Sequence, residues 1–131
     1  MTNVSPFKGW RYNNELIKDF SNVIVPPYDV ITTDEQNQYY EKSPFNYIRI
    51  NLNRLPKDER YYDAAGSLTE WKKNGVLTEE PKNAIYILSQ SFMQNGRMIA
   101  RVGCICALEL TELGQAVLPH EQTIEKHIDD R

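Results

Sequence analysis

The stretch AIYILSQSFMQNGRMIARVGCICALEL, residues 84–110, decides the fold because it holds two β-rich runs on either side of one tight turn. The runs are residues 84–93 and 97–110, and Asn95-Gly96 between them is the preferred pair for a two-residue type I′ hairpin turn. The sequence therefore predicts a long antiparallel hairpin.

The two-residue turn also sets the cross-strand register of this hairpin. It places Gln94 opposite Arg97, and the pairs continue outward until Ile85 lies opposite Cys106. Both faces are apolar toward the open end and more polar near the turn. We therefore expect the open end to be central in a sheet and the tip to be exposed.

A first helix is predicted upstream, near residues 33–42. Two threonines precede it, and either Thr32 with Glu35 or Thr33 with Gln36 matches the capping-box spacing. The helix should end before Pro44, since the residue that precedes a proline is disfavoured in the helical conformation.

A second helix is predicted near residues 58–74, where apolar side chains recur every three to four positions and Gly75 follows as a helix-ending glycine. Residues 23–25 read as a short buried strand, and residues 47–52 alternate with a period of two, as a strand does. The expected fold class is α+β: a mixed or antiparallel sheet around the central hairpin, with the two helices packed on it.

Length and charge limit the classes of protein that this chain can belong to. Its 131 residues suit a single α+β domain, which we expect over residues 1–118, with 119–131 as a loop and the start of a helix that leads into a further part. The net charge is −3, and the 15 Lys and Arg are scattered among 18 Asp and Glu, so no nucleic-acid partner is expected. The longest apolar run, residues 102–108, is too short to cross a membrane.

The two cysteines, Cys104 and Cys106, are separated by one residue. In a strand their Cα atoms lie at or beyond the limit for a disulfide, and two thiols are too few for a zinc site. We expect two buried free thiols, no metal site and a cytoplasmic location.

The segment LPHEQT, residues 118–123, is the first candidate site. His120 and Glu121 stand side by side after an expected strand, where they could carry out acid–base catalysis or hold an anion. Thr123 could hold a ligand at the start of a helix. The alternative is a capped turn in which Thr123 bonds backbone amides and His120 bonds a carbonyl group.

The segment PPYD, residues 26–29, is the second candidate. Its prolines could present Tyr28 and Asp29 to a ligand. Arg11 and Arg49, which flank aromatic residues, could each pair with a phosphate or a carboxylate. The alternatives are a packed tyrosine in an ordinary turn and a solvated surface arginine.

Five stretches, in consistent order over the whole chain, resemble one family: residues 6–12 (PFKGWRY), 25–31 (VPPYDVI), 44–50 (PFNYIRI), 71–77 (WKKNGVL) and 118–123 (LPHEQT). The family is the uncharacterised prokaryotic group called domain of unknown function 1015. The resemblance implies proteins several-fold longer than this chain, and a remote similarity to the ParB/sulfiredoxin superfamily through a later Asp-Gly-His-His-Arg motif. In the related free-serine kinases that motif sits at the phosphate-handling site.

This chain contains no such motif, and its histidines are His120 and His127. The resemblance therefore implies an N-terminal piece that stops before the motif, with Glu121 as an upstream carboxylate that activates a hydroxyl group. It also implies a nucleotide with Mg²⁺ as the cofactor of the full-length protein, and the remainder of the longer chain as the partner of this piece.

Two hypotheses about function follow, and the sequence leaves open whether the protein is an enzyme. The first is the N-terminal domain of a larger cytoplasmic protein, part of a nucleotide-dependent phosphotransferase related to free-serine kinases and inactive alone. The second is a non-catalytic regulatory module that binds a protein or a small ligand, such as a phosphorylated one, through the aromatic segments 6–12 and 26–29. The oligomeric state is not predicted.

Overall fold

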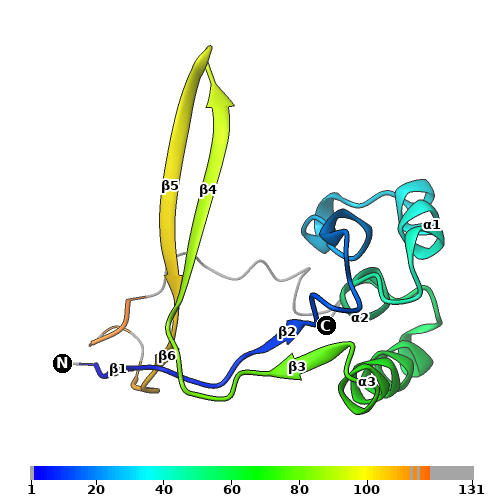
Figure 1. Cartoon of the computed structure of the whole chain (residues 1–131), viewed down its shortest axis with the longest axis horizontal. Coiled ribbons are helices and arrows are strands. Elements are labelled where there is room, and N and C mark those ends of the chain that lie inside the picture. The colour runs from blue at the N-terminus through cyan, green and yellow to red at the C-terminus, as the bar shows by residue number, and fades with distance from the viewer. Residues whose placement is uncertain (1, 113, 115, 119–131) are drawn as a thin grey trace. The chain divides into compact units, whose positions relative to one another are not determined.

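A computed structural model of the chain describes residues 2–112, 114 and 116–118. The chain divides into two compact units, one formed by residues 10–80 and the other by residues 1–9 together with 81–131 (Figure 1). The division of the chain into a domain over 1–118 and a following segment stays a prediction.

The unit of residues 10–80 contains the helices of the described chain. Strands β2 and β3 pair antiparallel, with Trp10 opposite Glu79 and Tyr12 opposite Leu77. The elements of this unit are β2 (Trp10–Tyr12), the 3-10 helices η1 (Phe20–Asn22) and η2 (Tyr28–Val30), α1 (Thr33–Lys42), α2 (Ile48–Asn51), α3 (Lys57–Lys73) and β3 (Leu77–Glu79).

Helix α1 confirms the prediction for residues 33–42, and Thr32 with Glu35 forms the capping box. The Thr32 hydroxyl accepts from the Glu35 amide at 3.3 Å, while the Glu35 carboxylate accepts from the Thr32 amide at 2.9 Å. The Glu35 carboxylate accepts from the Thr32 hydroxyl as well, at 2.8 Å, and the two bonds from Thr32 favour the ionised carboxylate and lower the pKa of Glu35. The Thr32 and Glu35 backbone amides thus each have a side-chain partner at the start of α1.

Helix α3 confirms the second predicted helix. It ends at Lys73, followed by Asn74 as the C-cap and by Gly75 at a φ of 72°. That positive φ is the left-handed conformation that glycine adopts without a steric penalty. The Gly75 carbonyl oxygen that follows this helix end also has a hydrogen-bond partner, because the Asn13 side chain donates to it at 3.0 Å.

The prediction of a strand at residues 47–52 is wrong, because residues 48–51 form helix α2. Asn46 explains the difference, since its side-chain oxygen accepts from the Ile48 amide at 2.9 Å and starts a turn. Its amide group donates to the Asn22 oxygen at 2.8 Å and ties the turn to the end of η1. The predicted strand at residues 23–25 is wrong too, since Val23 follows η1 and is buried outside any ladder.

The core of this unit forms around Trp71 of α3. The Trp71 ring lies 6.2 Å from the rings of both Tyr12 and Phe45, in a tilted and an edge-on geometry respectively. Tyr12 also donates from its hydroxyl to the Phe45 oxygen at 2.9 Å, and burial raises the pKa of this phenol far above its usual range. The remaining buried members of the cluster are Ile17, Val23, Val76 and Leu77.

The other unit is dominated by the hairpin of β4 (Tyr86–Gln94) and β5 (Arg97–Ile105). The nine cross-strand pairs of this ladder, from Gln94 opposite Arg97 to Tyr86 opposite Ile105, match the predicted register. The tenth predicted pair, Ile85 with Cys106, is not formed, because the ladder ends at Tyr86 and Ile105. Asn95 and Gly96 have φ values of 50° and 74°, as a type I′ turn requires. The predicted hairpin and the α+β class are therefore confirmed. The expectation that the open end of the hairpin is central in a sheet is wrong, because among the described residues β4 and β5 pair only with each other.

A short second ladder joins the ends of this unit. Strand β1 (Val4–Ser5) pairs antiparallel with β6 (Ala107–Leu108), and Phe7 forms an isolated bridge with Ala84. Tyr86 at the open end of the hairpin packs against Phe7, with ring centroids 5.2 Å apart, and its hydroxyl accepts from the Gly9 amide at 2.6 Å. The three ladders of the described residues are each two-stranded.

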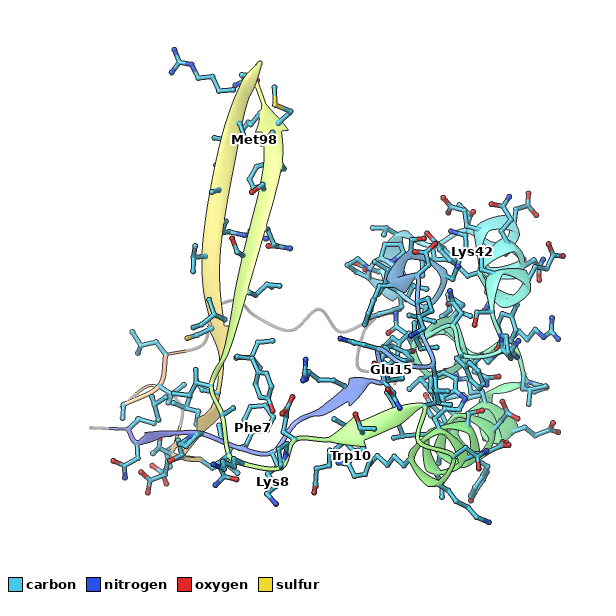
Figure 2. All side chains as sticks on the ribbon, viewed as in Figure 1. Phe7, Lys8, Trp10, Glu15, Lys42 and Met98 are labelled. Carbon is cyan, nitrogen blue, oxygen red and sulfur yellow. The ribbon has the colours of Figure 1, made fainter. Side chains whose placement is uncertain are left out.

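The hairpin exposes apolar side chains on both of its faces (Figure 2). Tyr86 is half-buried, but every residue from Ile87 to Ile105 is exposed. The predicted burial of the cysteines is consequently wrong: Cys104 is exposed and Cys106 is half-buried, both as free thiols. Partial desolvation and the neighbouring Cys104 raise the pKa of Cys106.

Candidate functional site

The predicted ligand residue Arg11 lies exposed on β2 and already has a partner. Its Nε donates to a carboxylate oxygen of Glu80, just beyond the end of β3. Lys72 of α3 lies beside the same ladder, with its Nζ 4.6 Å from the centre of the Trp10 ring. Arg11 thus forms an ion pair with Glu80 beside the β2–β3 ladder. Among the described residues it makes no contact with Tyr28 or Asp29.

The predicted residues Tyr28 and Asp29 form the start of η2, directly after Pro26-Pro27. Tyr28 is half-buried and Asp29 is exposed. The Val30 amide donates to the Pro27 oxygen at 3.3 Å, which closes the turn. This local turn places Tyr28 and Asp29 next to each other.

The other three predicted site residues, His120, Glu121 and Thr123, lie outside the residues that the structure describes. Their roles stay predictions. Within the described part of the chain, no group of three or more His, Cys, Asp and Glu side chains is placed to hold a metal ion. In that same part no helix is long and apolar enough to cross a membrane.

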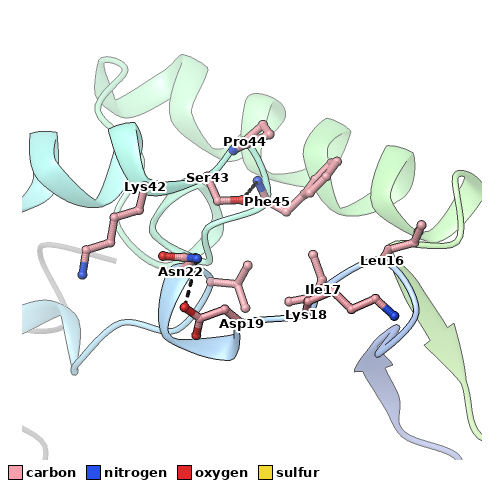
Figure 3. A pocket seen from close by; sticks show the side chains of 10 residues that line it. Leu16, Ile17, Lys18, Asp19, Asn22, Lys42, Ser43, Pro44 and Phe45 are labelled. Atoms are coloured by element: carbon pink, nitrogen blue, oxygen red, sulfur yellow. Dashed lines mark hydrogen bonds between the residues drawn. The ribbon is translucent and has the colours of Figure 1, made fainter.

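An open pocket of about 370 Å³ lies in the unit of residues 10–80, between the segment around η1 and the end of α1 (Figure 3). Its apolar wall reaches the core, because it includes the buried side chains of Ile17 and Val23. The complete lining is Leu16, Ile17, Lys18, Asp19, Asn22, Val23, Lys42, Ser43, Pro44 and Phe45.

The charges of this pocket are mixed. Asp19 accepts from the Ser21 amide at 2.9 Å and from the Asn22 side chain at 3.3 Å. The bonds from Ser21 are the main reason that the pKa of Asp19 is lowered, and the charge of Lys42 adds to them. Asp19 therefore stays ionised and closes the turn of η1.

Two lysines stand at opposite sides of the pocket in Figure 3. Lys18 forms an exposed ion pair with Glu15, at 3.4 Å, and Lys42 lies with its Nζ 4.7 Å from the centre of the Tyr39 ring. Exposed contacts of this kind are weak, so either ammonium group can turn toward a ligand. With the hydroxyl of Ser43 between them, the pocket suits a small ligand that combines an apolar part with an anionic group.

Sequence reasoning missed this pocket because its two halves are about twenty residues apart in the chain. Neither the 16–23 segment nor the 42–45 segment carries a motif, and they meet only where the Asn46 side chain reaches Asn22 and the Tyr47 amide reaches Val23. Because residues 47–52 were predicted to be a strand, these two hydrogen bonds to Asn22 and Val23 were not expected.

Comparisons with known proteins add one positive finding. A family model described as "Protein of unknown function (DUF1015)" matches residues 4–131, which is nearly the whole chain. Neither the search of curated proteins nor the search of solved structures gave a match.

Proposed function

The chain belongs to the DUF1015 family, and we propose that it is the N-terminal domain of a larger protein whose remaining polypeptide covers the β4–β5 hairpin. The single observation that carries this proposal is the apolar surface that the hairpin exposes on both faces. The proposed partner is the rest of the same longer chain.

The composition of the two faces is that of a strand pair buried on both sides. One face exposes Leu88, Phe92, Ile99 and Ile105; the other exposes Ile87, Met93, Met98 and Val102. An antiparallel hairpin with one wet face alternates apolar and polar residues, and this one does not. An isolated two-stranded hairpin is also marginally stable in water, and its outer edges hold unpaired backbone groups.

The free energy available from covering this surface is large. The eight side chains are each between 37% and 69% exposed, and full burial of such a side chain contributes roughly 1.5–3 kcal/mol. Covering all of them would contribute on the order of 10 kcal/mol, an upper estimate that equals the whole stability of a typical domain. Between residues 84 and 108 the only charges are Arg97 and Arg101, so the covering polypeptide should bring apolar side chains and carboxylates.

The larger protein is proposed to be a cytoplasmic, nucleotide-dependent phosphotransferase related to free-serine kinases, and this domain is proposed to be inactive alone. The support for the reaction class is the resemblance of the sequence motifs. Among the described residues no group of three or more His, Cys, Asp and Glu side chains is placed to hold a metal ion, so these residues supply no support for the reaction class. No catalytic step is therefore assigned to them.

A thermal-shift experiment tests this proposal on the 131-residue chain and on the longer polypeptide encoded with it. ATP with Mg²⁺ should raise the melting temperature of the longer polypeptide and leave that of this chain unchanged. Transfer of phosphate from ATP to free serine, or to another small hydroxyl compound, should likewise need the longer polypeptide. Turnover by this chain alone would overturn the claim that the domain is inactive.

A second candidate function is favoured by the pocket beside η1. A non-catalytic module that binds a small anionic ligand would use Lys18 and Lys42 for the anionic group and Phe45 for the apolar part. A small-molecule screen by thermal shift on this chain alone tests it. A ligand that stabilises the wild type but not a Lys42→Gln variant supports the module, and stabilisation of both equally contradicts it.

A further inference from the structure

We propose that Arg49 and Arg54, held against Tyr40, form a binding site for the phosphate group of a small molecule. The site lies in the unit of residues 10–80 and shares no residue with the hairpin or with the pocket beside η1. The proposal is therefore independent of both functions proposed above.

Both guanidinium groups contact the ring of Tyr40. The central carbon of the Arg49 guanidinium lies 4.5 Å from the centre of the Tyr40 ring, and that of Arg54 lies 4.4 Å from it. The two cations are therefore less than about 9 Å from each other. Arg49 also donates from Nη2 to the Tyr40 carbonyl oxygen at 3.2 Å, and the Arg54 amide donates to the Tyr40 hydroxyl at 3.2 Å.

Tyr40 itself is a firm support, since it is buried in the last turns of α1. Its aromatic ring and both of its oxygens are engaged by the two arginines, so the positions of all three residues depend on one another. The hydrogen bonds of Arg49 Nη2 and of the Arg54 backbone amide to Tyr40 fix part of this pair before an anion binds, so less side-chain ordering is needed on binding.

The positive charge of this pair has no partner among the described residues. The segment from Ser43 to Lys57 contains Arg49, Arg54 and Lys57 and no acidic residue. No carboxylate of the described chain forms an ion pair with Arg49 or Arg54. The carboxylate of Asp63 is used by Asn53, which donates to it at 2.6 Å.

Unused hydrogen-bond donors remain on both arginines. The Nε of Arg49 is buried and has no partner among the described residues, which is an unfavourable arrangement for an N–H group. The Arg54 side chain is exposed, and its contact in this part of the chain is the Tyr40 ring. A guanidinium presents its donors as a planar fork, so two forks can together hold an anion with several oxygens.

A phosphate monoester suits this pair better than a carboxylate does. It carries a charge near −2 and three free oxygens, enough for both forks, whereas a carboxylate has one charge and two oxygens. A small molecule is favoured over a nucleic acid because the chain has a net charge of −3 and its other cations are scattered.

Titration of the 131-residue chain with inorganic phosphate, at constant ionic strength, tests the proposal. The NMR signals of the arginine Nε–H groups provide a direct readout, and those of Arg49 and Arg54 should shift in a saturable manner below about 10 mM phosphate. Arg54→Gln should weaken the apparent Kd at least about tenfold. Arg49→Lys, which keeps the charge but loses the fork, should also weaken it.

Arg97→Gln is the matched control, since Arg97 is an exposed arginine on the hairpin and the charge change is the same. It should leave the apparent Kd within about twofold of the wild type. Absence of saturable shifts in the wild type, or equal weakening by Arg97→Gln and Arg54→Gln, would overturn the site. Acetate that binds as tightly as phosphate would overturn the assignment to a phosphate group.

Discussion

Replacement of Asn46 by alanine tests why residues 48–51 are helical. Asn46 is fully buried, and its side chain makes two hydrogen bonds, one from the Ile48 amide at 2.9 Å and one to the Asn22 oxygen at 2.8 Å. Asn46→Ala leaves both backbone groups without these partners. Each buried polar group that loses its partner costs about 1–3 kcal/mol, so the loss of both partners should lower the free energy of unfolding by about 2–6 kcal/mol.

Urea denaturation, followed by the fluorescence of the buried Trp71, measures this loss. The matched control is Asn14→Ala, the same chemical change at an exposed position whose side chain makes no described hydrogen bond, and it should change the stability by less than about 0.5 kcal/mol. NMR chemical shifts of residues 48–51 should also lose their helical values in Asn46→Ala. A loss below about 1 kcal/mol, or retained helical shifts, would refute the role given to Asn46.

Two further predictions concern α1 and the core. Hydrogen bonds from Thr32 hold the pKa of Glu35 below its ordinary value of 4.5, so the charged form adds stability that is complete above pH 4.5 and is lost as the pH falls through the folded pKa. The urea midpoint of the wild type should therefore exceed that of Glu35→Gln at pH 7, and the difference should shrink as the pH falls below 4.5. A difference that does not change with pH would contradict this. Trp71→Ala should cost about 3–5 kcal/mol, because the side chain is only 4% exposed. Tyr62→Ala, at an 82% exposed position of the same helix, should cost less than about 0.5 kcal/mol by circular dichroism, and similar losses for both would place the core elsewhere.

The elements that could be predicted from the sequence are those whose signals are local. The Asn95-Gly96 turn determines the register of the hairpin, and the capping box with Thr32 and the left-handed Gly75 mark the ends of α1 and α3. Each of these signals acts within a few residues. Local energetics alone therefore place these elements correctly.

The elements that could not be predicted depend on partners far away in the chain. The alternation of residues 47–52 suits a strand, but Asn46 bonds Asn22, 24 residues earlier, and the turn that it starts makes the segment helical. The pocket beside η1 is formed across the same long-range connection. The cysteines were expected to be buried because their strand is apolar, yet the other described residues do not cover β5.

Amide hydrogen exchange over residues 86–105 tests most directly whether the rest of a longer chain covers the hairpin. In a two-stranded antiparallel ladder every second amide points outward and is unprotected. In the 131-residue chain these outward amides should exchange rapidly, and in the longer polypeptide encoded with it those of at least one strand should become protected. Equal, rapid exchange of the outward amides in both polypeptides would contradict the account.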